Sequence, residues 1–205
     1  GLSPNMGFKA VLSIQPESWK GGSVSLDTVY FTSNRVVHTI SDLEGLLSMR
    51  NDPAGSYVVT ADIEGLNSYV LNSDRPFTGT IDFQGHKVTT SSFDALFATI
   101  SSSGVVKNLV LDYNATNTAA ATAVKSNFGG VATVNRGTLR NIILHYKPDN
   151  VGYGIDMQES GGICRDNYGL IDGFVVQFMK DIKVSYNFGG ICRTNRGTII
   201  NGYIC

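Results

Sequence analysis

The chain has 205 residues, a formal net charge of −1, 16% charged residues and 42% apolar residues. It has no basic stripe of the kind that nucleic acids select, and no apolar run approaches the ~20 residues of a transmembrane helix. We therefore expect neither nucleic-acid binding nor membrane insertion. Low charge with 23 glycines and abundant Thr, Ser and Asn is typical of extracellular all-β proteins.

Residues 1–37 predict an N-terminal β segment, distinct from residues 38–205. Phe8–Ile14 and Ser23–Thr32 are rich in strand-forming residues, and a proline and a glycine pair separate them. The segment is either a cap or the tail of a preceding domain. We favour a cap, because the first strand of a stacked fold would otherwise keep an unpaired edge. The chain opens with Gly1 rather than Met, which indicates a processed or cloned fragment.

Residues 41–50 predict a short helix that covers one end of the fold. Ser41 and Glu44 have the spacing of a capping box, and three leucines share one face. Strands are expected to follow at 57–63 and 77–90. The apolar face of the helix would contain Leu43, Leu46 and Leu47.

The last third of the chain repeats one glycine-rich phrase at intervals of about thirty residues, as stacked repeats do. The phrase reads Gly-Gly, an apolar residue, three further positions, then Asn-x-Gly. Its residues are Gly129, Gly130, Asn135 and Gly137 in the first copy, Gly161, Gly162, Asn167 and Gly169 in the second, and Gly189, Gly190, Asn195 and Gly197 in the third.

Each part of the phrase predicts a piece of backbone. The apolar run predicts a short strand, Asn-x-Gly predicts a tight turn, and the paired glycines allow a sharp corner. Strand, turn, strand and loop make one coil of a right-handed parallel β-solenoid, or β-helix. Equivalent residues of successive coils would lie about 4.8 Å apart, so the three turn asparagines would form a ladder.

A fainter copy, Phe97–Leu109, precedes the other three. Its alignment predicts a ladder of small side chains in the core. It also places three asparagines at one equivalent position, with Gly173 replacing them after Gly169, in the second of the three copies above. The small ladder would contain Ala98, Ala132, Cys164 and Cys192, and the asparagines are Asn108, Asn141 and Asn201.

Phe-Gly-Gly-Ile followed by Asn-x-Gly-x-Ile resembles the GLUG-type repeat of bacterial surface proteins. The preceding stretch is similar to the non-catalytic N-terminal region of the immunoglobulin-A-cleaving zinc metallopeptidases of streptococci. The resemblance covers about residues 38–205, and its matching segments are Ile40–Leu43, Asp52–Ile63, Phe77–Val88, Leu96–Phe97 and Val106–Leu109.

This resemblance implies a non-catalytic module of a secreted bacterial cell-surface protein, which serves adhesion or positions a ligand, upstream of a peptidase domain. The resemblance does not decide between a host protein and a glycan as the ligand.

The catalytic patterns that we sought are missing from the sequence. A zinc metallopeptidase needs two His at i and i+4 on a helix. His38, His86 and His145 are far apart, and the scattered Asp residues form no calcium motif. We therefore expect no enzyme activity, no cofactor and no obligatory metal in this fragment.

A polysaccharide-active β-helix enzyme, a lyase or a hydrolase, is the alternative. Arg165 and Arg193 would stack on adjacent coils beside Asp166, as a possible stripe for an anionic ligand. The repeats lack the convergent pair of carboxylates that glycoside hydrolysis needs, and ordinary solvated side chains explain the stripe more simply.

The three cysteines include two at equivalent repeat positions, Cys164 and Cys192, whose Cβ vectors would run side by side. We expect both to be reduced and buried. The chain stops at Cys205, soon after the last phrase, as if truncated. A terminal coil normally needs a polar cap, so we expect the natural protein to continue, and this end to associate with other copies.

Overall fold

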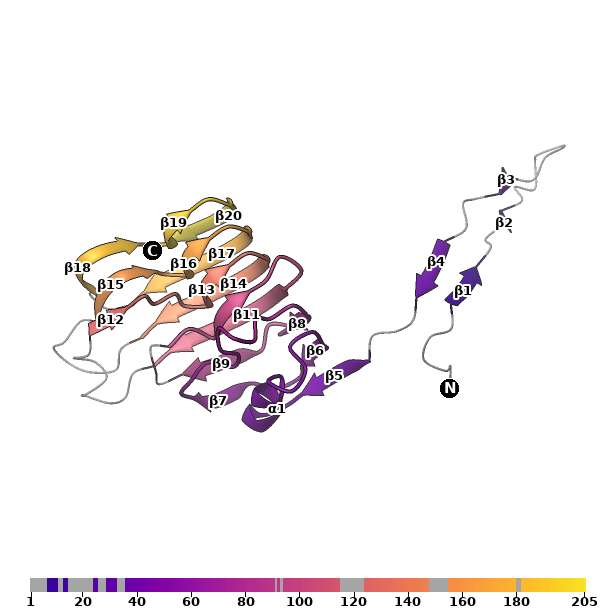
Figure 1. Cartoon of the computed structure of the whole chain (residues 1–205), viewed down its shortest axis with the longest axis horizontal. Helices are drawn as coiled ribbons and strands as arrows, with labels where there is room; N and C mark the ends of the chain where they lie inside the picture. The colour runs from indigo at the N-terminus through magenta and orange to yellow at the C-terminus, as the bar shows by residue number, and fades with distance from the viewer. Residues whose placement is uncertain are drawn as a thin grey trace. The chain divides into compact units, whose positions relative to one another are not determined.

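The computed structural model describes residues 7–10, 13–14, 24–25, 29–32, 36–90, 92, 94–114, 124–147, 155–179 and 182–205. The chain forms two compact units, Gly1–Val36 and Val37–Cys205. In the described residues every element is a β-strand except one six-residue helix, α1 (Leu43–Ser48), as Figure 1 shows. The expected all-β class with a short helix is therefore confirmed.

The first unit contains two antiparallel pairs. Strand β1 (Gly7–Ala10) pairs with β4 (Val29–Thr32), and β2 (Ser13–Ile14) pairs with β3 (Val24–Ser25). The proposal that this segment caps the second unit stays a prediction.

The second unit is built on a nine-stranded parallel sheet, which we call the long sheet. Its order is β20-β17-β14-β11-β8-β6-β5, and β9 pairs with both β11 and β7. Its strands are β5 (Val37–Ile40), β6 (Ser56–Val59), β7 (Ile63–Leu66), β8 (Thr80–Asp82), β9 (Lys87–Thr90), β11 (Val105–Tyr113), β14 (Thr138–Tyr146), β17 (Leu170–Phe178) and β20 (Thr198–Ile204).

Two smaller parallel sheets complete the unit. One has the order β10-β13-β16-β19 and the other β12-β15-β18. Their strands are β10 (Phe97–Ile100), β13 (Ala132–Asn135), β16 (Cys164–Asn167) and β19 (Cys192–Asn195), then β12 (Val124–Ser126), β15 (Ile155–Gly161) and β18 (Ile182–Gly189).

The chain visits the three sheets in the same order three times, as β12–β13–β14, β15–β16–β17 and β18–β19–β20 (Figure 1). We call each triplet a repeat unit. Ala132 pairs with Cys164, and Cys164 with Cys192, so equivalent residues of successive units lie in register.

The register of the earlier copy differs from the sequence alignment. Phe97, not Ala98, pairs with Ala132, so the prediction of Ala98 in the small ladder is wrong. A slip of one residue exchanges the two faces of a strand. The observed register buries Phe97 completely and stacks its ring on Phe77, with centroids 5.0 Å apart.

Helix α1 begins at a different cap from the expected one. The N-cap is Asp42, whose carboxylate accepts a hydrogen bond of 2.7 Å from the backbone N–H of Gly45, and not Ser41. Leu46 is fully buried, and Leu43 and Leu47 pack partly buried against the core. The helix therefore has the predicted apolar face and is shorter than the predicted 41–50.

An aromatic column runs through the core at the end of the long-sheet strands. The rings of Tyr113, Tyr146 and Phe178 stack in register, with centroids 5.1 and 4.9 Å apart. The Tyr113 hydroxyl donates to the carbonyl of Gly130 at 2.6 Å, and the Tyr146 hydroxyl donates to the carbonyl of Gly162. Burial raises the pKa of both phenols, so both remain donors.

A second column consists of amides, and we call it the inner ladder. Asn135 Nδ2 donates to Asn167 Oδ1, and Asn167 Nδ2 donates to Asn195 Oδ1, each at 2.8 Å. Each Oδ1 also accepts the backbone N–H of the glycine two residues on, at 3.1 to 3.3 Å. Asn135 and Asn167 are fully buried, whereas Asn195 is exposed.

Asn167→Ala should destabilise the protein by about 3 kcal/mol, because it removes the oxygen that accepts from the Gly169 N–H and from Asn135 Nδ2. Asn135 Nδ2 then keeps only the Leu170 carbonyl, at 3.5 Å. The matched control is Asn195→Ala, which removes the same bonds where water can replace them, at less than about 1 kcal/mol. Urea unfolding measures both. Equal losses would contradict the burial of the inner ladder.

The double glycines are required by close backbone approach. None of Gly130, Gly162 and Gly190 has a positive φ. A Cβ on Gly162 would lie far closer to the carbonyl oxygen of Gly190 than the 3.0 Å that Cβ atoms respect. A Cβ on Gly190 would meet only the Cδ1 tip of Ile204, at 2.7 Å.

Gly162→Ala should therefore lower the free energy of unfolding by about 2–3 kcal/mol, as overpacking against backbone does. Gly190→Ala, at the same place in the phrase, should cost less than about 1 kcal/mol, because the end of the Ile204 side chain can move aside. Thermal or urea unfolding compares the two. A Gly190 variant as unstable as the Gly162 variant would contradict this account.

The third repeat unit is more exposed than the other two. Ile200, Tyr203 and Ile204 on β20 are 43%, 59% and 42% exposed. Cys164 is buried, Cys192 half-buried and Cys205 exposed, and all three are free thiols. End-to-end association through this unit stays a prediction.

Candidate functional site

The outer face of the long sheet carries a row of residues in the left-handed conformation. Asn108, Asn141, Gly173 and Asn201 share one register position and have φ values of 55°, 54°, 74° and 58°. Asn and Gly tolerate this conformation better than other residues. The row therefore interrupts the strands at one level, and the chain bends there in every repeat.

Side-chain amides join this row from strand to strand, and we call them the outer ladder. Asn141 Nδ2 donates to Asn108 Oδ1 at 2.9 Å, and Asn108 Nδ2 donates to Asp82 Oδ1 at 2.8 Å. Asn201 Nδ2 donates to Asp172 Oδ1 at 2.8 Å. The ladder breaks at Gly173, where a Cβ would lie 2.8 Å from the amide oxygen of Asn141.

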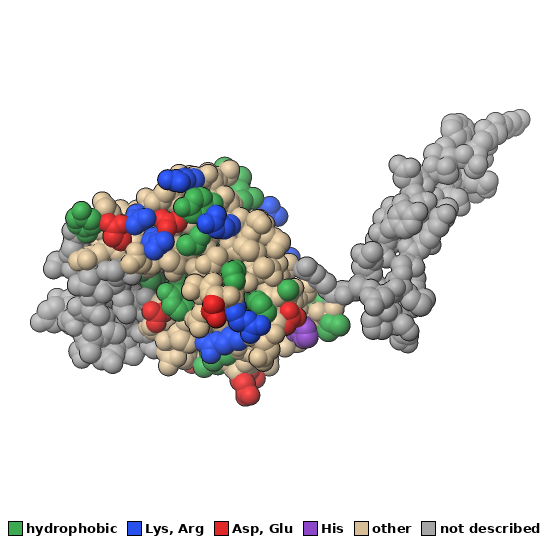
Figure 2. Space-filling view, in the orientation of Figure 1, with side chains coloured by type: hydrophobic (Ala, Val, Ile, Leu, Met, Phe, Trp, Pro, Cys, Tyr) green, Lys and Arg blue, Asp and Glu red, His purple; other side chains and the backbone are tan. Residues whose placement is uncertain are grey.

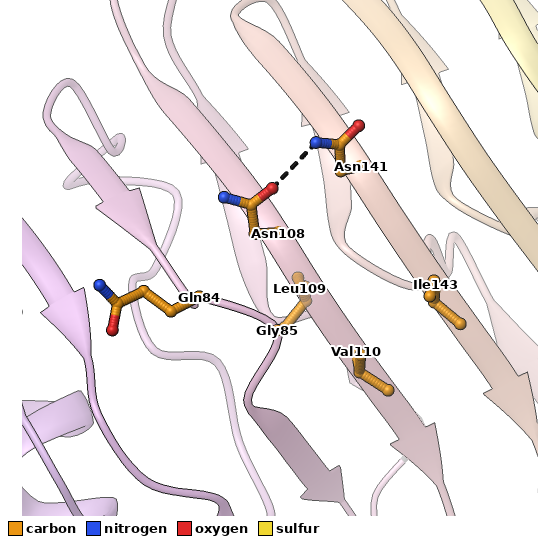
Figure 3. A pocket seen from close by; sticks show the side chains of 7 residues that line it. All are labelled: Gln84, Gly85, Asn108, Leu109, Val110, Asn141 and Ile143. Carbon is orange, nitrogen blue, oxygen red and sulfur yellow. Dashed lines mark hydrogen bonds between the residues drawn. The ribbon is translucent and has the colours of Figure 1, made fainter.

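A shallow hollow of about 340 Å³ opens beside the outer ladder. Figure 3 shows the Asn108–Asn141 bond, with Val110 and Ile143 further along the neighbouring strands β11 and β14. The hollow thus combines amide groups with aliphatic side chains. Its lining is Gln84, Gly85, Asn108, Leu109, Val110, Asn141 and Ile143.

A charged cluster adjoins the hollow on the same face. Asp112 and His145 follow Val110 and Ile143 by two residues, so their side chains leave the same side of the sheet. Asp112 Oδ1 lies 2.6 Å from His145 Nδ1, and Asp112 Oδ2 accepts from Lys147 Nζ at 2.9 Å. Burial raises the pKa of the Asp112 carboxyl, but the bonds from Lys147 and His145 outweigh it and lower the pKa below its ordinary value.

The lowered pKa makes the Asp112 contribution to stability depend on pH. A carboxyl with a depressed pKa in the folded state stabilises it above the unfolded pKa of about 3.9, and this stabilisation is lost as pH falls through the folded pKa. Asp112→Asn should therefore cost about 1–2 kcal/mol at pH 7, and the difference from wild type should shrink as pH falls below about 3.9 and through the lowered folded pKa.

Urea unfolding across this pH range measures the effect. The control is Asp74→Asn, at an exposed carboxylate with no ion pair in the described residues, which should leave stability unchanged at both ends. A difference for Asp112→Asn that persists at pH 2 would show that its carboxylate charge is not the cause.

The structure brings Arg165 and Arg193 together, but acidic and amide groups engage both. Arg165 donates to Asp166 at 2.7 Å, and to Asn127 at 3.2 Å. Arg193 donates to Asp166 at 3.1 Å, and to Glu159. Two guanidinium groups therefore face two carboxylates, so the cluster offers no excess positive charge and does not favour the predicted anion stripe.

Charged side chains of both signs also lie close together elsewhere on the second unit, as Figure 2 shows for one face. Lys107 lies 3.0 Å from Asp82, and Arg140 lies 3.2 Å from Asp172.

Among the predicted glycines and asparagines of the phrase, Asn135 and Asn167 are buried in the core, Asn195 is exposed, and Gly189 borders a hollow. This second hollow, of about 500 Å³, is also lined by Glu159, Asn187, Phe188, Arg193 and Thr194. His38, His86 and His145 are not brought together. Within the described ranges no group of three or more His, Cys, Asp or Glu side chains is placed to hold a metal ion.

Sequence reasoning missed the Asp112–His145–Lys147 cluster, although its signal was present. Asn108 and Asn141 were correctly aligned, and counting four positions on places Asp112 beside His145.

Comparisons with known proteins identify no relative. No family model matches the chain, no curated protein matches it, and no solved structure matches it. Among the described residues, no helix has the length and apolarity to cross a membrane.

Proposed function

We propose that residues 38–205 form a non-catalytic right-handed β-solenoid module of a secreted bacterial cell-surface protein. The module binds an extended ligand, such as a surface glycan, for adhesion or to position it for a neighbouring domain, including a peptidase domain of the same chain.

The parallel register of the repeat units supports the proposal that the second unit is a β-solenoid. Each unit contributes one strand to each of three sheets, and each strand pairs with its equivalent in the next unit. Side chains of equivalent residues therefore recur at steps of about 4.8 Å along the stack. A ligand with its own repeat is the natural partner of such a surface.

The hollow beside the outer ladder is the observation that carries the binding function. It is open and shallow, and at about 340 Å³ it is near the lower end of ligand sites, which suits one segment of a long ligand. The amides of Gln84 and Asn141 supply hydrogen bonds, and Val110 and Ile143 supply apolar contact. Sugars present both hydroxyl groups and apolar C–H faces, so a glycan matches this lining.

The bonds that hold the carboxylates of Asp82 and Asp112, near the hollow, favour ligand positioning over glycan hydrolysis. Glycoside hydrolysis uses two carboxyl groups that flank the scissile bond. Asp82 is held by Asn108 and Lys107, and Asp112 is held by His145 and Lys147. These bonds stabilise both charges and oppose proton donation to a leaving group.

A polysaccharide lyase or hydrolase is the second candidate, and one observation favours it. Asp112 fixes the His145 ring from 2.6 Å, as a carboxylate does when it orients a histidine that acts as a base. Turnover of a polymeric glycan that His145→Ala abolishes would replace the binding function by this one.

The binding function of the hollow is tested on a panel of neutral glycans immobilised on a surface. The double variant Val110→Ser/Ile143→Ser removes the aliphatic part of the hollow and should weaken glycan binding at least tenfold, which is about 1.4 kcal/mol. The control Val184→Ser removes an exposed aliphatic side chain from β18, away from the long sheet, and should change binding less than twofold. Equal binding by the double variant and wild type would overturn the assignment of the hollow.

A further inference from the structure

The middle residue of the Asn-x-Gly turn forms its own ladder on the surface. Arg136, Tyr168 and Arg196 occupy this position in the three repeat units, and all three are exposed. The guanidinium carbon of Arg136 lies 4.7 Å from the Tyr168 ring centroid, and that of Arg196 lies 5.9 Å from it. Both distances fall within the range of cation–π contact.

These two guanidinium groups differ from the other arginines of the second unit. Arg140, Arg165 and Arg193 are paired with carboxylates, and the side chains of Arg50 and Arg75 donate hydrogen bonds to backbone carbonyls. In the part of the chain that the structure describes, no carboxylate forms an ion pair with Arg136 or Arg196, and no hydrogen bond engages either side chain. A guanidinium that rests on an aromatic ring keeps its N–H edge free, and that edge matches the two oxygens of a carboxylate or sulfate.

Backbone hydrogen bonds in the Asn-x-Gly turns also fix the positions of Tyr168 and Arg196. The backbone N–H of Tyr168 donates to the carbonyl of Asn135, and that of Arg196 donates to the carbonyl of Asn167, each at 2.7 Å. The inner ladder lies directly beside these turns. Binding a ligand here requires little ordering of the backbone, which improves affinity.

We propose that Arg136, Tyr168 and Arg196 form a binding site for two oxyanion groups of an acidic polysaccharide. The two cations are two repeat steps apart, roughly 10 Å. That spacing is comparable to the distance between acidic groups on alternate sugars of a linear chain. Both guanidinium groups lie over the Tyr168 ring, so the ring is already engaged where a nucleic-acid base would stack.

The choice of a polysaccharide over other polyanions rests on the proposed surface function. The site itself is separate from the hollow beside the outer ladder, so the two can fail independently. Val110→Ser/Ile143→Ser should leave acidic-polysaccharide binding unchanged within twofold.

The test measures the affinity of the whole chain for dextran sulfate and polygalacturonate, with neutral dextran, polyglutamate and single-stranded DNA as comparison ligands. Wild type should bind the two acidic polysaccharides and not neutral dextran. Arg136→Ala/Arg196→Ala should weaken this binding at least tenfold. Tyr168→Leu should weaken it several-fold, whereas Tyr168→Phe keeps the ring and should bind as wild type does.

A charge-matched control, Arg75→Ala/Lys87→Ala, removes two positive charges elsewhere on the unit and should change affinity less than twofold. Urea unfolding of each variant verifies that it is folded. An unchanged affinity in the Arg136/Arg196 variant, or an equal loss in the control, overturns the site. Polyglutamate or DNA that binds as tightly, with the same dependence on the two arginines, overturns the assignment to polysaccharide.

Discussion

Side-chain amide bonds between equivalent asparagines are the constraint on which the repeat units depend. A buried amide that loses its partner leaves donors and acceptors unsatisfied, so Asn135 and Asn167 tolerate only one register between neighbouring units. The same register brings the glycine corners close enough for the tyrosine hydroxyls to reach their carbonyls. The strand register, the close glycine corners and the stacked aromatic column therefore all follow from the same alignment of neighbouring repeat units.

This alignment also positions the two proposed binding surfaces. Rows of left-handed residues bend the strands at a fixed level, and the hollow forms where the bend separates amide groups from aliphatic ones. Arg136, Tyr168 and Arg196 lie at the Asn-x-Gly turns, which the inner ladder stabilises. Core and surface repeat together, so a ligand that contacts one repeat unit meets related side chains at the next.

The repeated phrase predicted much of the second unit, because its spacing reports the repeat, its glycines mark close backbone approach, and its asparagines mark a turn whose side chains bond to one another. It did not predict the register of Phe97, since alignment by residue type cannot show which face a strand buries. The helix cap was displaced because Ser41 and Asp42 are both good caps, and only the fold selects between them. Arg165 and Arg193 were considered as a possible ligand stripe beside Asp166, with ordinary solvated side chains as the simpler explanation. Glu159, the second carboxylate that engages Arg193, comes from β15, which only the three-dimensional stack brings beside it.

The two amide ladders point in opposite directions along the stack. In the inner ladder each N–H points toward the following unit, an orientation fixed by the glycine N–H that bonds the oxygen. In the outer ladder each N–H points toward the preceding strand, an orientation fixed by Asp82, whose carboxylate can only accept. The amide dipoles of the two ladders therefore have opposite senses along the stack. In an α-helix the peptide dipoles all align and add up to one macrodipole, whereas the side-chain dipoles of these two ladders do not add to one another.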